Sequence, residues 1–434
     1  MFKKLIFVFS SWISFGMPAQ QVMDWGSLPQ EVNDKVYSLT NYNGKMVAAG
    51  AFTKAGNTSF SQIAAWDGSN WSGFGKGIRG NYVFRTYVFN NELYAVGDFD
   101  SAGTIATKNI AKWDGTAWSG FGTGANSIVY ALAMYNGKLY AAGDFTSISG
   151  TAANYIAKWD GTSWQPLGTG LQSTVYGALE LHIHQNQLFV SGTITNAGSL
   201  TVNGCARWND TVWKAAPMAI SRNPLAMCDW NSKLLMAGDL PPYNTSEVLQ
   251  WVDSLWTTFI PQTPFNIRTM FVNGSKLYGS GGGLLTTGYS TVTEWDSLAG
   301  QWTILGSGIT DYTRGLCLYN GELYCGGFFN VANGAYHNYI TKYGITTGIM
   351  ANELNQVEVN VSPNPFTNKI KISVSGGRDQ IERIEILNTL GVSIYSTKNG
   401  AKSTDVDLEF LMPGVYYLDI GSSAGGKTIK IIKQ

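Results

Sequence analysis

Four residues of this chain carry side chains that could form a binding site, because each interrupts a repeated position that is otherwise small. Arg85, Glu180 and Arg268 align with Ala131 in the inner strand expected for each copy of a repeat, and His182 replaces an alanine two residues further on. Two interpretations are open. The side chains could form a small polar site for an anionic ligand such as an acidic sugar, or a compensated cluster of ions in a wet interior. The second is the simpler.

The same segment contains two histidines that could begin a metal site. His182 and His184 are two residues apart on an expected strand, so both side chains lie on one face. The chain has three histidines in total and no third ligand is evident, so we expect no metal and no cofactor. Nucleophile-elbow, zinc-protease, P-loop and EF-hand motifs do not occur. No catalytic residue is therefore predicted, although glycosidase carboxylates that converge from distant loops cannot be recognised by spacing.

A second set of candidates lies in the longer loops, which differ in sequence between copies of the repeat. Variable loops on a rigid scaffold are a usual place for recognition, and exposed aromatic rings can stack on sugars. The loop candidates are Arg79, Tyr82, Tyr312 and Tyr336. The aspartates that recur at fixed places, such as Asp114, are instead expected to cap turns.

A repeat positions these residues. A turn flanked by alternating apolar residues, as in "YNGKLYAAG" at 135–143, recurs seven times, roughly every 46 residues. A second marker, "KWDGTSW" at 158–164, follows it and degrades in later copies. Four short strands per copy predict the blade of a β-propeller. We therefore expect an all-β chain with a seven-bladed β-propeller over residues 21–343.

The ends of the repeat predict how the ring closes. The seventh copy stops at Tyr343 without its second tryptophan, and the segment "VMDWGSLPQ" at 22–30 matches the missing strand. This pairing would join the first and last blades and remove a free sheet edge. An open solenoid or two sandwiches are the alternatives. The repeats resemble kelch-like and galactose-oxidase-like propellers, and also repeats of fungal cortical cell-polarity markers, which implies the fold but no chemistry.

Composition limits the function. The 434 residues include 29 basic and 29 acidic residues, so no nucleic-acid partner is expected. Residues 1–20 carry two lysines, an apolar run and a small-residue end, the pattern of a signal peptide. No later segment is long and apolar enough to cross a membrane. The four cysteines occupy apolar positions of the repeat, which favours buried free thiols over disulfides.

The C-terminal part differs in pattern. Residues 344–356 are an expected linker, and residues 357–434 contain seven short alternating strands, which predict a small Ig-like β-sandwich. The motifs "SPNPF", "EILNTLGVSIY", "MPGVYYLDI" and "KTIKIIK" follow in that order. With them this segment resembles the type A C-terminal sorting domain of the type IX secretion system of Bacteroidota. The motif residues are Pro363, Asn364, Pro365, Gly391, Pro413, Gly414, Tyr416, Lys430 and Lys433.

The resemblance implies a route and a set of partners. Such a tail implies handling by the type IX secretion machinery, passage through the periplasm, and secretion or display on the outer-membrane surface. It usually also implies tail removal and attachment to surface lipopolysaccharide. We therefore expect an exported propeller that binds or scaffolds a polysaccharide or a surface protein. A carbohydrate-active hydrolase or lyase on the loop-rich face is the alternative.

Overall fold

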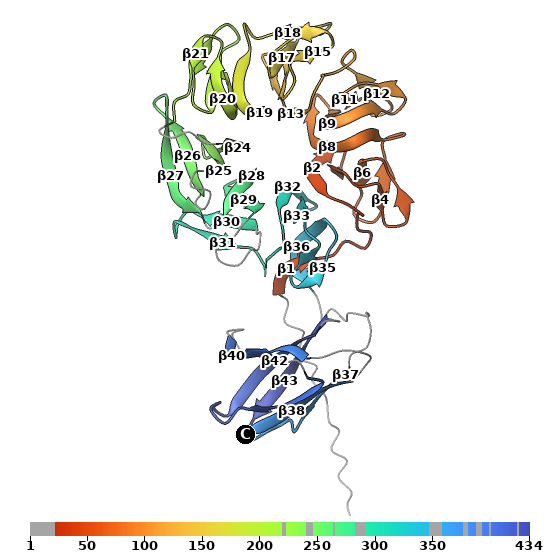
Figure 1. Ribbon diagram of the computed structural model, residues 1–434, viewed down its shortest axis with the longest axis vertical. Helices are drawn as coiled ribbons and strands as arrows, with labels where there is room; N and C mark the ends of the chain where they lie inside the picture. The colour runs from red at the N-terminus through yellow and green to blue at the C-terminus, as the bar shows by residue number, and fades with distance from the viewer. Residues whose placement is uncertain are drawn as a thin grey trace, which may run out of the picture. The chain divides into compact units, whose positions relative to one another are not determined.

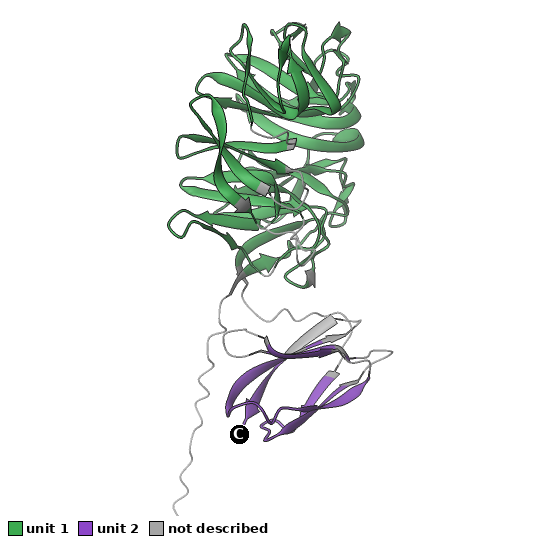
Figure 2. Cartoon of the chain, turned by 60° about the vertical axis from the view of Figure 1, so that its left-hand side comes forward, with its two compact units in different colours: residues 1–347 green, residues 348–434 purple. Residues whose placement is uncertain are grey.

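The computed structural model describes residues 22–218, 223–239, 246–263, 265–282, 292–306, 308–346, 358–375, 381–387, 393–398, 401–422 and 425–434. Within these ranges every regular element is a β-strand, which confirms the all-β prediction. None of the described residues forms a helix that could cross a membrane. The expected signal peptide and most of the expected linker lie outside the described residues. The chain divides into two compact units, residues 1–347 and 348–434 (Figure 2).

The described part of the first unit contains seven antiparallel sheets with four principal strands each, arranged around a ring (Figure 1). In chain order these strands are β2 (Val36–Tyr42), β3 (Lys45–Gly50), β6 (Ile63–Trp66) and β7 (Trp71–Gly73); β8 (Ile78–Phe89), β9 (Glu92–Ala102), β11 (Ile110–Trp113) and β12 (Trp118–Gly120); β13 (Val129–Tyr135), β14 (Lys138–Gly143), β17 (Ile156–Trp159) and β18 (Trp164–Pro166); β19 (Leu171–His184), β20 (Gln187–Ala197), β22 (Cys205–Trp208) and β23 (Trp213–Ala215); β24 (Asn223–Trp230), β25 (Lys233–Asp239), β26 (Ser246–Val252) and β27 (Leu255–Thr263); β28 (Asn266–Asn273), β29 (Lys276–Gly282), β30 (Val292–Asp296) and β31 (Gln301–Ile304); and β32 (Thr313–Tyr319), β33 (Glu322–Gly327), β36 (Ile340–Thr346) and β1 (Val22–Gly26).

Short two-residue strands decorate the connecting loops. They are β4 (Lys54–Ala55), β5 (Thr58–Ser59), β10 (Ile105–Ala106), β15 (Ser147–Ile148), β16 (Thr151–Ala152), β21 (Leu200–Thr201), β34 (Val331–Ala332) and β35 (Ala335–Tyr336). Most of them pair as small hairpins beside the main sheets.

The turn residues of the repeat adopt the backbone that the sequence predicts. Asn136 and Gly137, between β13 and β14, have φ angles of 48° and 72°, the left-handed pair of a type I′ turn. The expected aspartate caps are also present. Asp160 Oδ1 accepts hydrogen bonds of 2.8 Å from the backbone N–H groups of Thr162 and Ser163. These bonds fix the turn that leads to the second tryptophan of the marker, Trp164.

The ring closes as expected. Strand β1 pairs antiparallel with β36, with Trp25 opposite Tyr343, so the sheet order is β1-β36-β33-β32. Trp25 is 1% exposed and packs in the same apolar cluster as Leu316 and Phe329. The first described strand therefore supplies the outer strand of the last sheet (Figure 1).

All four cysteines, Cys205, Cys228, Cys317 and Cys325, are free and buried, which confirms the prediction of free thiols. Burial raises the pKa of Cys205 and Cys317 to about 12. These thiols are therefore protonated and unreactive at neutral pH.

The second unit contains two antiparallel sheets. One joins β37 (Glu358–Ser362), β38 (Lys369–Ser375) and β41 (Ser403–Asp407), and the other joins β40 (Ser393–Lys398), β39 (Ile381–Leu387), β42 (Gly414–Ser422) and β43 (Gly425–Lys433). Isoleucines and leucines of both sheets form one core with Phe366, which is 1% exposed.

Candidate functional site

A β-bulge recurs in the inner strand of every described sheet of the ring. In β13, Val129 pairs with Gly143 and Ala131 pairs with Ala142, so Tyr130 is an extra residue with no partner of its own. The other six inner strands shift register at the same place. The bulged residues are Tyr37, Phe84, Tyr130, Leu179, Leu225, Arg268 and Arg314, which we call the bulge ring.

A repeated glycine explains why the bulge forms. Gly143 ends strand β14 opposite the bulge, and a Cβ on it would lie 2.1 Å from the carbonyl O of Ile128 on the entering chain. A Cβ on Gly50 would lie 2.0 Å from the carbonyl O of Lys35 in the same way. Glycine therefore lets the entering chain approach closely enough to bulge. Bulges re-aim side chains and are common beside functional sites.

Residues of the same type lie next to one another in the bulge ring. Going round, the sheets contribute three aromatic residues, two leucines and two arginines. The aromatic members form a continuous row, since the ring centroids of Tyr37 and Phe84 are 5.9 Å apart and those of Phe84 and Tyr130 are 5.2 Å apart. Phe328 extends the row with its centroid 4.9 Å from that of Tyr37.

A cavity lies inside the ring of sheets and reaches the bulge ring. Its volume is about 190 Å³, and Tyr37, Arg268 and Arg314 line it together with Arg85 and Glu180. Small-molecule sites typically enclose about 300–1,000 Å³, so this cavity is smaller than most of them. The described lining carries three guanidinium groups and one carboxylate, a net charge of +2. The cavity is therefore small, partly open to solvent and electrically positive.

Arg85 and Glu180, two of the predicted channel residues, form an ion pair. The Nη1 atom of Arg85 donates to Oε2 of Glu180, and its Nη2 atom lies 3.5 Å from the carbonyl O of Leu225. Strands β8 and β24, which carry Arg85 and Leu225, stand on opposite sides of the ring (Figure 1). Burial opposes the charged guanidinium, but the charge of Glu180 outweighs it and raises the pKa of Arg85. The pair thus ties the two sides together.

His182, the third predicted channel residue, belongs to a different cluster. Its Nε2 atom lies 3.3 Å from Oδ2 of Asp229, whose Oδ1 atom lies 2.6 Å from Nδ1 of His184. Burial alone would raise the pKa of Asp229, but contacts with the two imidazoles outweigh it and lower the pKa. The sequence did not single out Asp229. Across the described ranges, no group of three or more His, Cys, Asp or Glu side chains is arranged to hold a metal ion.

The structure places Arg268 one residue away from the alignment expected from the sequence. Thr269, not Arg268, pairs with Ser280 and so aligns with Ala131. Arg268 is a bulge residue, and its guanidinium lies 4.9 Å from the ring centroid of Tyr312. Arg314 holds the same place in the next sheet and lies 5.7 Å from the ring centroid of Phe328. Arg314 did not stand out in the sequence, because its neighbour Gly315 fits the expected position.

The loop candidates separate into two groups. Tyr82 stacks on Tyr37 with centroids 5.1 Å apart, and Tyr312 packs under Arg268, so both belong beside the bulge ring. Burial and nearby Asp98 raise the pKa of Tyr82 to about 12. Neither Arg79 nor Tyr82 is in a loop, because β8 begins at Ile78; Arg79 pairs with Ser101 and Tyr82 with Asp98. Tyr336 is 75% exposed on the small strand β35.

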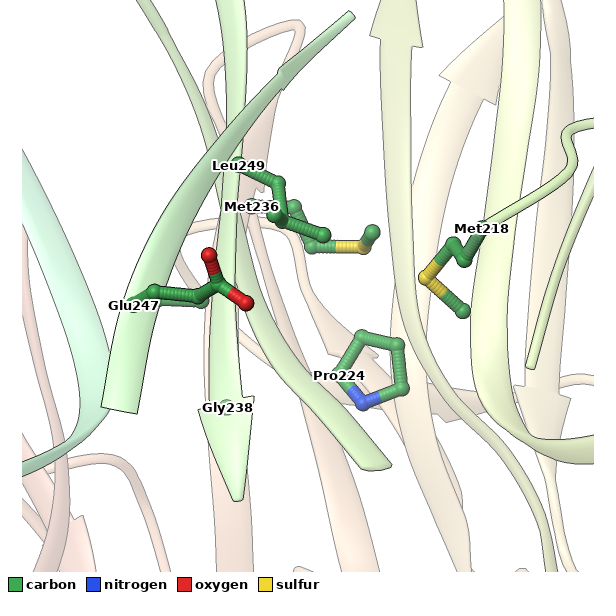
Figure 3. A pocket seen from close by; sticks show the side chains of 7 residues that line it. Met218, Pro224, Met236, Gly238, Glu247 and Leu249 are labelled. Atoms are coloured by element: carbon green, nitrogen blue, oxygen red, sulfur yellow. The ribbon is translucent and has the colours of Figure 1, made fainter. Parts of the chain in front are cut away.

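A second hollow lies between β24, β25 and β26 (Figure 3). Met218, Pro224, Met236 and Leu249 make it mostly apolar, and the Glu247 carboxylate lies at one side. Its volume is about 10 Å³, far below the usual range of about 300–1,000 Å³ for ligand sites. The cavity at the bulge ring is the better candidate.

In the second unit, the predicted motif residues at the two ends of the module meet. Asn364 donates a hydrogen bond of 2.8 Å to the carbonyl O of Lys430 and accepts one of 2.9 Å from the backbone N–H of Ile432. Lys433 lies with its Nζ 5.5 Å from the ring centroid of Phe366. Pro363 and Pro365 flank Asn364. Strand β42 begins at Gly414, directly after Pro413, and the Tyr416 hydroxyl donates to the carbonyl O of Met412 at 2.8 Å. Gly391 lies outside the described residues.

Two family models match the chain. Residues 360–434 match the secretion system C-terminal sorting domain, and residues 136–158 match a β-propeller domain of unknown function, DUF5122. The first match confirms the predicted sorting tail and implies export by the type IX system through the periplasm, to a secreted or cell-surface location. The second confirms a β-propeller. No curated protein matches the chain.

Solved structures with a similar fold come from varied proteins. PorZ, a surface component of the type IX secretion system of Porphyromonas gingivalis, is 13% identical with a TM-score of 0.41, over 93% of this chain and 60% of PorZ. The extracellular domain of the one-component system BT4673 from B. thetaiotaomicron is 12% identical with a TM-score of 0.48, over 96% of this chain. This chain spans 60% of that protein as well. A fungal AA5-family alcohol oxidase, solved with copper, is 13% identical with a TM-score of 0.49, over 94% and 99%.

Proposed function

We propose that this protein is a seven-bladed, kelch-like β-propeller that the type IX system delivers to the cell surface, where it binds a polysaccharide at the bulge ring. The Ig-like sorting module is removed on the way, and the mature chain is attached to surface lipopolysaccharide. The seven four-stranded sheets support the blade count, and the two packed sheets of the tail support the Ig-like description. The proposed domain bounds remain 1–20, 21–343, 344–356 and 357–434.

The bulge ring carries this proposal. Seven equivalent positions, one from each sheet, form the ring, and five of them are aromatic or arginine residues. Three of these, Tyr37, Arg268 and Arg314, line the cavity. Aromatic rings and guanidinium groups that converge on a positive cavity are typical of ligand sites.

The cavity offers little support for a hydrolase. Glycosidases act through two carboxyl groups that flank the bond. Among the described residues that line the cavity, Glu180 is the only carboxylate, and it is engaged by Arg85. We therefore propose binding without hydrolysis.

Affinity electrophoresis tests the proposal. The purified protein would migrate through gels that each contain one neutral or acidic polysaccharide, and we expect at least one polymer to retard it. Tyr37→Ala should abolish the retardation, whereas Tyr336→Ala, a change at an exposed tyrosine on β35, should not. The polymer should keep its chain length. Free migration in every gel, or equal effects of the two variants, would refute carbohydrate binding at this site, and a shortened polymer would favour the hydrolase.

A further inference from the structure

We propose that the ligand of the bulge ring is an anionic sugar, whose acidic group binds Arg268 and Arg314 while its ring packs on the aromatic row. This inference rests on the proposed function and adds the chemical class of the ligand. Carboxylate and sulfate groups share the relevant chemistry, a compact anion attached to a sugar ring.

The two arginines are placed as a pair. Arg268 and Arg314 occupy the same bulge position in neighbouring sheets, on β28 and β32, and both line the cavity. Each guanidinium packs on an aromatic ring, at 4.9 Å from the centroid of Tyr312 and 5.7 Å from that of Phe328. Such packing orients the guanidinium plane. Guanidinium groups held in this way favour bidentate binding of an anion.

The charge balance of the cavity favours an anion. The one carboxylate of the described lining, Glu180, pairs with Arg85. The positive charge of the lining therefore exceeds the negative charge near the bulge ring. The ion pair between Arg85 and Glu180 corresponds to the compensated cluster that the sequence suggested, whereas the arginines of the bulge ring are a separate group.

The aromatic row supplies the second part of the site. Tyr37 lines the cavity beside Arg314, and Phe84 lies 5.9 Å from the Arg314 guanidinium. Tyr37 is held by its stacking on Tyr82 and by its edge contact with Phe328. A rigid aromatic surface next to two cations matches a molecule that is apolar on one face and charged at one edge. A sugar ring with an acidic substituent has this form.

The alternative anion, a nucleic acid, fits less well. Nucleic-acid binding needs an extended basic surface that follows many phosphates. This chain carries 29 basic and 29 acidic residues, so its formal net charge is zero, and three arginines line the cavity. A single anionic sugar needs only the local pair.

Isothermal titration of the purified protein with three trisaccharides tests the inference. The probes are trigalacturonate, its carboxyl-reduced galactose form, and a sulfated galactose trimer. We expect trigalacturonate or the sulfated trimer to bind at least about tenfold more tightly than the neutral trimer, because a charge-assisted hydrogen bond contributes about 1.5–3 kcal/mol and 1.4 kcal/mol is tenfold. The stronger of the two acidic trimers identifies the anion as carboxylate or sulfate.

Variants locate the effect. Arg268→Gln and Arg314→Gln should each lose about tenfold in affinity for the acidic trimer. Arg207→Gln is the matched control, because Arg207 also lies over an aromatic ring, 5.2 Å from the centroid of Trp251, but on β22, the third strand of its sheet. It does not line the cavity. It should bind as the parent does.

Three results would overturn the inference. Equal binding of the neutral and acidic trimers would leave a sugar-binding propeller without anion selectivity, and Tyr37→Ala should then weaken both. Equal effects of Arg207→Gln and Arg314→Gln would remove the arginine pair from the site. A lack of binding by all three trimers would reject the anionic class, while retardation by neutral polysaccharides would still uphold the proposed function.

Discussion

The indole Nε1 of Trp25 donates a hydrogen bond of 2.7 Å to the carbonyl O of Leu305, three residues after Trp302. Consecutive sheets elsewhere in the ring are joined by the same bond. Trp118 donates to Phe74, Trp164 to Phe121 and Trp213 to Leu167, in each case three residues after the tryptophan of the preceding sheet. Trp25 therefore joins the last sheet to the one before it as an ordinary outer strand does.

Replacement of this tryptophan should destabilise the ring as much as replacement of an internal one. We expect Trp25→Ala to lower the free energy of unfolding by about 3–5 kcal/mol, the usual cost of removing a buried tryptophan. Trp164→Ala, at 2% exposure, is the matched comparison and should cost a similar amount. Denaturant unfolding measures both. If Trp25→Ala costs less than about 1 kcal/mol while Trp164→Ala costs the full amount, β1 would not be a structural strand.

The ion pair between Arg85 and Glu180 should affect both the stability of the protein and its affinity for an anionic ligand. Glu180→Gln keeps the shape but removes the charge that balances Arg85, so we expect a loss of about 1–3 kcal/mol in unfolding free energy. Affinity for an acidic trisaccharide should rise because the cavity becomes more positive. Glu92→Gln is the control, since Glu92 pairs with Lys112 at 2.7 Å on a more exposed surface and should cost about 0–1 kcal/mol. Unchanged stability and affinity in Glu180→Gln would contradict the role of the pair.

His337 should make the stability of the propeller depend on pH. It is 1% exposed, and its Nδ1 atom lies 3.9 Å from Oε1 of Glu31, which follows the closing strand. Burial lowers the pKa of His337 below its ordinary value. The unfolded chain therefore takes up a proton below about pH 6.5 that the folded chain does not, and stability falls as the pH drops through that value.

His337→Ala should reduce this loss of stability, because alanine does not titrate. Alanine should be tolerated at this position, since Ala153 occupies the equivalent buried place in another sheet. The difference between the parent and variant unfolding curves from pH 7 to 5.5 isolates the histidine from Glu31, whose pKa is raised by burial and which acts with the opposite sign. We expect the difference in unfolding free energy between the parent and the variant to change by up to about 1.4 kcal/mol per pH unit. Parallel curves would show that His337 does not titrate on unfolding.

Asn364 should hold the sorting module together at its two ends. Its side chain makes two hydrogen bonds to β43, so Asn364→Ala should lower the stability of the module by about 1–3 kcal/mol. Limited proteolysis of the tail measures the change, and the amount of protein outside the cell reports on export. Asn360→Ala, at an exposed asparagine of β37, is the control and should behave as the parent does. Equal protease resistance of the two variants would refute the clamp.

The sequence predicted the features that repeat, because repetition itself is the signal. The turns at residues such as Asn136, the buried cysteines and the closing strand all follow from alignment of the copies. The bulge ring could not be recognised in this way. The bulge lies at the same place in every sheet, so alignment of the copies does not reveal it. Arg268 was misplaced because the turn of its sheet lies at Gly274 and Ser275, one residue later than the Asn-Gly pair used for the alignment. Arg314 was concealed because its neighbour Gly315 fitted the expected position.

The sequence also could not predict the pairs of interacting side chains that lie on different sheets. Arg85 was singled out as an interruption of the pattern, but its partner and the carbonyl of Leu225 lie on other sheets. Nothing in the sequence pairs Asp229 with His182, and only the fold brings the two side chains together. Arg79 was placed in a loop because the extension of β8 beyond its neighbours has no counterpart in β13.

The position of the closing strand has a consequence for the order of synthesis. A ribosome makes β1 long before it makes β36, so β1 remains an unpaired edge, open to incorrect pairing, while nearly all of the ring is produced. The sorting module follows β36 directly along the chain. A nascent chain that has completed its tail has therefore already completed both partners of the closing sheet, and the signal for the last step of export is attached only to chains that are able to close.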